Sequence, residues 1–515
     1  MDTEKSDKLV EETPHDPFPQ LEGKSQDPWF NLQFDLQSST EMPGITQIPP
    51  GIWNPNILYR GSENWLSRFA KDNEDEQKSN IRQEVLALFA RWLKMQNVRI
   101  LIGAGASFYV TGFIGSGLFG RVRKLLEGRS SELTLKAILA HASAPDKVGC
   151  HFEKFLSQLT AWRSLSEASQ WPIDQMILDI PLKGIRGRQL RITKLSELLL
   201  DLERAITVVC NVDLPSSRFS APDDRYHEWN ITPHEALIAK LSARDPQQGR
   251  TKIFTTNYDT LIEQAMDRLG VMYCDGFSGT VARRFNPAAY DLDLYYPGEV
   301  TEGRVRRFDK VLHLYKLHGS INWRRSKFGT AGNPYGIVFD NRPLPREVDL
   351  LHGKSKNPAS PDLERVLDKG EGLAILPTSG KYGETLAMPF SHMFRAFSQA
   401  LREPQTVLMI IGYSGWDDHI NQLIEDALTN PSFTCVIIDP NPSSWARRLC
   451  RADACGRVYC LGGHWGTFEF FALHVLPDLE VLRTELAIAQ TLRDLQKSQN
   501  NKIWLKLQEG GGDGA

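Results

Sequence analysis

The sequence predicts an α/β protein built on a doubly wound parallel sheet, and three observations support this prediction. Short apolar runs of the length of buried strands recur along the chain. Each run ends in small or polar residues such as Gly, Asn, Asp or Ser. Helical patterns follow or separate these runs, and strands that alternate with helices form parallel sheets. In such sheets the carboxyl ends of the strands meet at one edge, where ligands bind.

Composition supports a globular protein and excludes several classes. The chain has 515 residues, of which 41% are hydrophobic and 24% charged, enough for a large core. Its net charge of −3 gives no overall basic field for nucleic acid. The chain contains no apolar run long enough to span a membrane, and its first residues do not resemble a signal peptide, which predicts a cytoplasmic protein. Its seven cysteines include no Cys-x-x-Cys pair, so neither a disulfide framework nor a redox pair is indicated.

Three regions are expected along the chain. Residues 1–80 form an N-terminal arm, residues 81–475 the main domain, and residues 476–515 a C-terminal helix and tail. The first part of the arm is rich in Pro, Asp, Glu, Gln and Ser and carries isolated aromatic residues such as Trp29 and Trp53. It is expected to dock on another surface through those aromatics, and plain disorder is the alternative.

A glycine-rich turn follows the first predicted strand. A helix over Ile81–Gln96 leads into the strand Val98–Ile102, which runs into Gly103-Ala-Gly-Ala-Ser107. Small residues there let the backbone approach a ligand, and N–H groups beyond a strand end can hold a pyrophosphate. The spacing Gly-x-Gly-x-x-Gly is completed only further on, over 115–120. No clean strand precedes that second match, so we interpret it as fortuitous.

A long helical stretch separates this turn from the next strand. Residues from about 120 to 250 show mainly helical patterns, most clearly over Lys194–Ile206. A stretch of this length between two strands of one sheet predicts a helical insert. We expect this insert to cover the crevice at the sheet edge.

Two polar side chains follow the next strand, within Lys252–Glu263. An apolar run breaks at Thr255-Thr-Asn-Tyr-Asp259 and restarts as a helix near Thr260. Asn257 and Asp259 can cap that helix, and capping alone would explain both residues. They can also point into a crevice at the strand end.

A histidine marks the end of the following strand. The strand Val311–Leu317 stops at His318, which Gly319 follows. A lone histidine is more often a structural group than a catalyst. At the carboxyl end of a strand, however, His318 can face the same crevice as Asn257 and Asp259.

The last part of the predicted sheet repeats the pattern. Sheet structure resumes at Leu373–Leu376, and the strand Thr406–Ile411 ends in Gly412-Tyr-Ser-Gly before a helix over His419–Leu428. The strand Thr434–Ile438 ends in Asp439, which is placed either to bind a ribose or to start an ordinary turn before Pro440. A strand over Arg457–Leu461 completes the sheet.

Together these strand ends resemble a known family. The order Gly-Ala-Gly-Ala-Ser, Thr-Thr-Asn-Tyr-Asp, Leu-His-Gly-Ser, Gly-Tyr-Ser and Asp-Pro-Asn resembles the sirtuin superfamily. It is most similar to the sirtuin-like NAD hydrolases of bacterial antiphage defence. The match covers roughly residues 95–465, interrupted by the helical insert, and implies a Rossmann-like fold.

The resemblance implies a role for each motif. It places Asn257 and Asp259 beside the nicotinamide ribose and makes His318 the catalytic histidine. The residues it implies for NAD binding are Gly103, Ala104, Gly105, Ala106, Ser107, Thr256, Gly412, Tyr413, Ser414 and Asp439. Sirtuin deacylases continue the first motif with Gly-Ile-Pro-Asp-Phe-Arg, whereas here Phe113-Ile114 follows Gly112. The aspartate and arginine of that run therefore cannot be assigned to positions in this sequence.

A missing module favours hydrolysis of NAD over deacylation. Deacylases carry a four-cysteine zinc module after the histidine motif, but this chain has no cysteine between Cys274 and Cys435. We therefore expect no zinc and predict an NAD glycohydrolase that produces nicotinamide and ADP-ribose. A protein deacylase and a non-catalytic module that senses NAD or ADP-ribose are the alternatives.

The predicted chemistry requires few groups. The nicotinamide of NAD is cationic and leaves as a neutral amide, so no general acid is needed to protonate it, unlike an ordinary glycoside. Asn257 and Asp259 are expected to stabilise positive charge on the ribose, and His318 to act as a base through a ribose hydroxyl.

As an effector that depletes NAD in abortive infection, the protein is expected to form a homo-oligomer. It is also expected to depend on a separately encoded partner, either a hexameric translocase-type ATPase or a short Argonaute.

Overall fold

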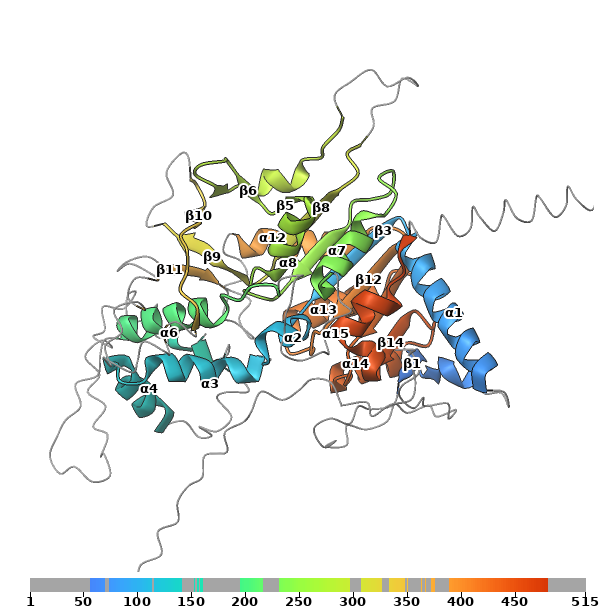
Figure 1. Cartoon of the computed structure of the whole chain (residues 1–515), viewed down its shortest axis with the longest axis horizontal. Helices are drawn as coiled ribbons and strands as arrows, with labels where there is room; N and C mark the ends of the chain where they lie inside the picture. Colours follow the sequence, from blue (N-terminus) through green and yellow to red (C-terminus); the bar gives the residue numbers. More distant parts are fainter. Residues whose placement is uncertain are drawn as a thin grey trace, which may run out of the picture.

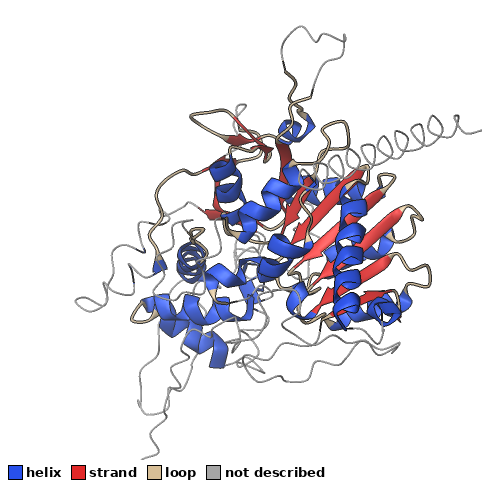
Figure 2. Cartoon of the chain, turned by 45° about the vertical axis from the view of Figure 1, so that its right-hand side comes forward, coloured by secondary structure: helices blue, strands red, loops and turns tan. Residues whose placement is uncertain are grey.

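The fold is a mixed α/β architecture with a large sheet and helices on both of its faces (Figures 1 and 2). A computed structural model describes residues 56–69, 74–113, 115–140, 195–215, 231–296, 307–326, 333–347, 372–375 and 389–479. It also describes individual residues within 152–160 and residues 350, 363 and 366. Among the described residues, no helix combines the length and the apolar character that crossing a membrane requires.

The main sheet has nine strands in the order β2-β1-β14-β13-β12-β3-β4-β8-β5. The strands from β14 to β5 all run parallel, and β1 and β2 extend one edge in antiparallel pairing. Figure 2 shows these strands side by side. Their bounds, in sheet order, are Glu63–Asn64, Ile57–Arg60, Val458–Gly462, Phe433–Ile438, Thr406–Ile411, Asn97–Ile102, Lys252–Thr255, Val311–Lys316 and Met272–Cys274. The parallel sheet predicted from the sequence is confirmed.

Helices cover both faces of this sheet, which explains its continuous apolar strands. Because side chains alternate along a strand, Met409 of β12 packs into one core cluster and Ile410 into the other. The first cluster includes side chains of α1 (Glu74–Leu93), α7 (Pro233–Ser242) and α8 (Leu261–Leu269). The second includes those of α12 (Phe390–Arg402), α13 (Asp418–Ala427) and α14 (Ser444–Ala452). Strands buried on both faces are therefore rich in apolar residues.

A second, antiparallel sheet lies beside the first. Its order is β11-β9-β10-β7-β6, and β9 (Gly319–Arg325) begins directly after His318. The other strands are Gly372–Ile375, Ile337–Phe339, Arg284–Phe285 and Phe277–Ser278. The strand expected over Leu373–Leu376 is therefore β11, and it joins this smaller sheet instead of the parallel one. A short apolar run does not encode which sheet it joins.

Part of the helical insert expected over residues 120–250 gathers at one end of the molecule, whereas α7, which also falls in that range, packs on the main sheet. Helices α3 (Gly115–Leu126), α4 (Ser130–Ala140) and α6 (Leu195–Val209) lie together at the side opposite α1 (Figure 1). They share a third core cluster that also contains Tyr258 and Ile321, from the loop after β4 and from β9. The Gly-x-Gly-x-x-Gly match over 115–120 lies in α3, not in a strand-to-helix turn. The interpretation of that match as fortuitous is confirmed.

The N-terminal boundary differs from the one expected at residue 80. Strand β1 pairs with β14, and its residues Leu58 and Tyr59 are fully buried. Helix α1 begins at Glu74, before the predicted start at Ile81. The sheet therefore already includes residues from 57 onward, because β1 is paired on one side with β14 and on the other with β2. Residues 1–55 and the helix expected beyond Leu479 lie outside the described residues.

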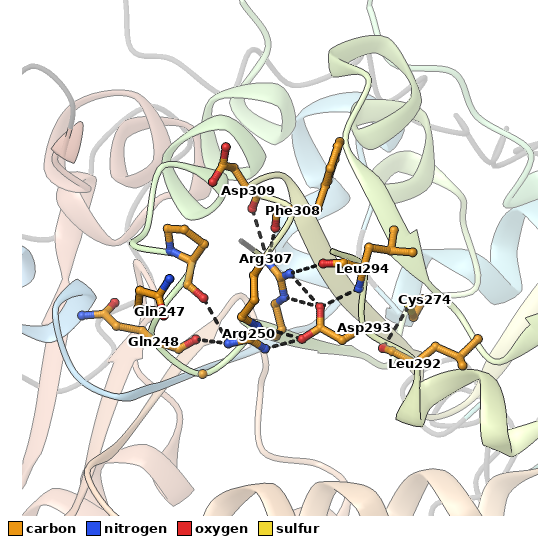
Figure 3. A network of polar contacts seen from close by, with 12 residues as sticks. Gln247, Gln248, Arg250, Cys274, Leu292, Asp293, Leu294, Arg307, Phe308 and Asp309 are labelled. Carbon is orange, nitrogen blue, oxygen red and sulfur yellow. Dashed lines mark hydrogen bonds and ion pairs between the residues drawn. The ribbon is translucent and has the colours of Figure 1, made fainter. Parts of the chain in front are cut away.

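An ionic network fastens the segment after β5 to the amino end of the sheet (Figure 3). Arg250 donates from Nε and Nη2 to Asp293 Oδ1 at 2.9 and 2.6 Å. Arg307 donates from Nε to Asp293 Oδ2 at 2.9 Å, and its Nη1 reaches the carbonyls of Pro246 and Gln248 at 3.0 Å each. Two guanidinium groups thus share one carboxylate. This network lies at the sheet edge opposite the carboxyl ends, away from the candidate site.

Candidate active site

Five neighbouring strands end at the same level of the sheet. In the pairing register, Ile438 of β13 lies beside Ile411 of β12, and Ile411 lies beside Ile102 of β3. Ile102 in turn lies beside Thr255 of β4, and Thr255 beside Lys316 of β8. Every site residue predicted from the sequence follows one of these five strands. The sheet order thus brings all five motifs to one edge.

The switch point of the sheet lies between β3 and β12. From β3 the chain builds outward through β4 and β8, whereas β12, β13 and β14 build in the opposite direction. Ligands of doubly wound sheets bind outside the carboxyl ends at such a point. The turns Gly103–Ser107 and Gly412–Ser414 flank it on the two sides.

The glycines at the switch point pack two backbones together. A Cβ atom on Gly103 would lie 2.6 Å from the Gly412 carbonyl oxygen, and one on Gly105 would lie 2.8 Å from Gly412 Cα. Gly412 has a φ of +61°, and its own Cβ would lie 2.6 Å from the Ala106 nitrogen. Gly103 and Gly105 donate their N–H groups to the carbonyls of Ile411 and Gly412, both at 2.9 Å. These two N–H groups therefore hold the two turns together. The sequence pattern alone could not distinguish this role from phosphate binding.

Ser107 links the first two motifs. Asn257 donates from Nδ2 to Ser107 Oγ at 2.9 Å and to the Gly103 carbonyl at 3.1 Å. Ser107 Oγ donates to Asp259 Oδ2 at 2.7 Å. Asp259 Oδ1 accepts the N–H of Leu261, the first residue of α8, at 3.1 Å. Asp259 thus bonds the first N–H group of α8 from the position before the N-cap residue Thr260, and it also holds the glycine-rich turn, whereas Asn257 does not bond the helix end.

The Asn257 side chain presents a buried acceptor that has no hydrogen-bond partner among the described residues. Its orientation is fixed, because the Gly103 carbonyl can only accept, so Nδ2 must face it and Oδ1 must face away. A buried acceptor left unpaired costs about 1–3 kcal/mol. The Asn257 Oδ1 atom is therefore suited to a donor that a ligand supplies.

Lys316 is a site residue that sequence reasoning missed. Its Nζ donates to the Asp259 carbonyl and, at 2.9 Å, to Glu263 Oε1. Both side chains of this ion pair are largely buried. Burial raises the pKa of Glu263, and Lys316 opposes that rise. A lysine at the end of a largely apolar strand was the signal, because lysine is almost never fully buried unless it is paired.

His318 lies next to a second residue that was missed. The His318 side chain is buried, its ring centroid is 6.4 Å from that of Tyr258, and its Nε2 is 3.9 Å from Asp417 Oδ2. Burial, with a smaller contribution from the neighbouring Asp418 charge, raises the pKa of Asp417 to about 7. The pair Asp417-Asp418 directly after the Gly-Tyr-Ser-Gly turn was the available signal.

The remaining predicted residues take different positions. Tyr413 is buried, and its hydroxyl lies 3.0 Å from Asn421 Oδ1, so it packs the loop. The side chains of Ala104 and Ser414 are exposed, whereas that of Ala106 is buried. The Thr256 N–H donates to the Ile102 carbonyl at 3.0 Å.

Asp439 lies at the end of β13, on the far side of the switch point from Asn257. The residue is partly exposed, but its carboxyl is enclosed, and burial raises its pKa to about 6. Its Oδ1 accepts the Asn441 N–H at 2.8 Å. The turn-starting role is therefore present, and among the described residues Oδ2 has no hydrogen-bond partner. Within the described part of the chain, no three His, Cys, Asp or Glu side chains are arranged to hold a metal ion.

Comparison with known proteins finds a family model that is similar to one part of the chain. A family model described as a SIR2-like domain matches residues 251–454, from just before β4 to just after α14. This part is therefore sirtuin-like, and NAD-related activity is supported in general terms. The glycine-rich turn Gly103–Ser107 lies outside the matched residues but is bonded to them through Asn257 and Gly412. No curated protein matches the chain.

Proposed function

Residues 251–454 resemble a SIR2-like domain, and from this premise we propose that the chain is an NAD glycohydrolase that cleaves NAD to nicotinamide and ADP-ribose. The observation that carries the proposal is the buried Asn257 Oδ1, held without a partner among the described residues at the switch point of the sheet. An acceptor oriented in this way fits a polar group of the nicotinamide riboside half. The edge extends over five strands, which is long enough to hold a dinucleotide.

Each site residue has one task in the reaction. The bond between the ribose carbon and the nicotinamide nitrogen breaks, and a water oxygen bonds to that carbon. The Asn257 amide and the Asp259 carboxylate stabilise the positive charge that develops on the ribose. His318 takes up the proton that the water loses, through a ribose hydroxyl, and later releases it to solvent.

Lys316 and Ser107 hold these groups in place. Lys316 fixes the Asp259 backbone to the end of β8, two residues before His318, and Ser107 fixes the Asp259 carboxylate to the glycine-rich turn. Such contacts reduce the freedom of the reacting groups before substrate arrives.

In the cell, we propose, the enzyme is the NAD-depleting effector of an antiphage system and acts in the cytoplasm as a homo-oligomer. Unrestrained NAD cleavage would kill the host, so activity must await a trigger. The helical insert packs its core against Tyr258 and Ile321, next to Asn257 and near His318. A separately encoded partner, a hexameric translocase-type ATPase or a short Argonaute, would activate the enzyme by binding the open arrangement of the insert more tightly than the closed one.

The test is incubation of the purified protein with NAD, with and without the product of the neighbouring gene. Nicotinamide and ADP-ribose are expected in equal amounts. A parallel reaction contains an acyl-lysine peptide. Nicotinamide release that requires the peptide, with transfer of the acyl group, would show a deacylase instead. Binding of NAD without any product under all conditions would show a sensing module.

A further inference from the structure

The loop after β12 brings a buried carboxyl group to His318. Asp417 is 7% exposed, and its Oδ2 lies 3.9 Å from His318 Nε2. The two residues are on different strand connections, His318 after β8 and Asp417 before α13. Among the described residues, His318 is the one ion-pair partner of Asp417.

Asp417 occupies a capping position without capping. It is the N-cap residue of α13, where an aspartate normally accepts a backbone N–H of the first turn. Its side chain makes no such bond, and Oδ1 has no hydrogen-bond partner among the described residues. Helix capping therefore does not explain this carboxyl group, which faces His318 instead.

The backbone around Asp417 is fixed. The Asp417 N–H donates to Tyr413 Oη at 3.2 Å, and the Tyr413 hydroxyl lies 3.0 Å from Asn421 Oδ1. Asn421 Nδ2 donates to the Gly415 carbonyl at 2.8 Å. These bonds between the turn and the first turns of α13 hold the carboxyl group in position beside the imidazole.

The charged groups considered around the pair do not compete with His318 for the Asp417 carboxylate. Asp418, on α13, is exposed and carries a like charge. Lys316, two residues before His318, donates to Asp259 and Glu263. Tyr258 and Tyr413 contribute an aromatic ring near His318 and a hydroxyl near Asp417. A protonated His318 is thus the cation that pairs with Asp417.

We propose that Asp417 is a positioning residue for His318: its carboxylate orients the imidazole and stabilises the imidazolium formed when His318 takes up a proton. This proposal rests on the proposed NAD hydrolysis. With Asp417 in its carboxylate form, the proton passes from the ribose hydroxyl to His318, and solvent later receives the proton. Removing the carboxylate should therefore make protonated His318 less stable.

The first test does not depend on catalysis. Histidine-selective ¹³C labelling follows the titration of His318 by NMR, with the resonance assigned through His318→Gln. In Asp417→Asn the midpoint is expected to fall by about one pH unit, because a nearby anion favours the charged imidazole. Asp426→Asn, which removes an exposed carboxylate further along α13, is the control and should leave the midpoint unchanged. An unchanged midpoint in Asp417→Asn would overturn the proposal.

The second test measures nicotinamide release in two backgrounds. Asp417→Asn is expected to lower kcat about 10- to 100-fold and to move the acid limb of the pH profile to lower pH. In the His318→Ala background the same change should have no further effect, and Asp417→Glu should restore part of the rate. Equal losses in both backgrounds would show that Asp417 acts on the substrate directly, which contradicts the positioning role. If the unaltered protein releases no nicotinamide, the proposed function fails while the NMR result still decides the pairing.

Discussion

Ser107 donates a hydrogen bond of 2.7 Å to Asp259, although 152 positions separate the two residues in the chain. The same hydroxyl accepts from Asn257 Nδ2 at 2.9 Å. One serine thus joins the glycine-rich turn after β3 to both polar residues of the loop after β4.

We predict that Ser107→Ala slows NAD cleavage about 10- to 100-fold, because a bond to a carboxylate contributes about 1.5–3 kcal/mol and here orients two site residues. The rate of nicotinamide release measures the effect. Ser242→Ala is the matched control and should keep the full rate, since within the described part of the chain the Ser242 hydroxyl bonds only to the Ile238 carbonyl of α7. A Ser107→Ala enzyme as fast as that control would show that the link has no role in the reaction.

The buried pair Lys316–Glu263 predicts a difference between single and double variants. Lys316→Met should lower the free energy of unfolding by about 3–5 kcal/mol, because it leaves Glu263 buried without its cation. The double variant Lys316→Met/Glu263→Leu should recover most of that loss. Urea unfolding measures both. The exposed pair Arg68–Glu63 supplies the control, and Glu63→Gln should cost no more than about 1 kcal/mol. A double variant less stable than the single one would contradict the prediction.

The sequence predicted the sheet and its edge better than the contacts at that edge. Apolar runs buried on both faces, such as Thr406–Ile411, identify parallel strands because few other structures bury every position. Asp417 and Lys316 were missed because their partners, His318 and Glu263, come from other segments, and sheet order and helix placement decide which side chains meet. Which sheet a short run joins was unpredictable for the same reason.

Glu469 predicts a dependence of stability on pH. Burial raises its pKa from 4.5 to about 7 in the folded protein. The folded state therefore binds the proton more tightly, so this group's stabilising contribution is complete below about pH 4.5 and is lost as pH rises to about 7. Glu469→Gln should remove this dependence and raise the free energy of unfolding at pH 8 by about 3 kcal/mol. Exposed Glu84→Gln is the control. Identical pH profiles for the Glu469 variant and the unaltered protein would refute the shift.

The N-terminal arm is best tested by a deletion that spares β1. Removal of residues 1–50 should leave the fold and the chemistry intact, because Leu58 and Tyr59 keep their places in the core. We predict that it alters oligomer size or activation by the partner. Light scattering and partner-dependent NAD cleavage measure these properties. Unchanged size, unchanged partner binding and unchanged activation would exclude the arm from assembly. Deletion to residue 60 would instead remove β1 and unfold the sheet edge.

The proposal that this sheet edge cleaves NAD is tested most directly by following nicotinamide release from NAD with the purified protein and its partner. We predict equal molar amounts of nicotinamide and ADP-ribose. Asn257→Ala and His318→Ala should each lower the rate by about 10²–10⁴-fold, equivalent to roughly 3–5 kcal/mol of barrier, while thermal unfolding shows an intact fold. Full turnover by the His318→Ala protein, or no release by the unaltered protein with its partner, would contradict the proposal.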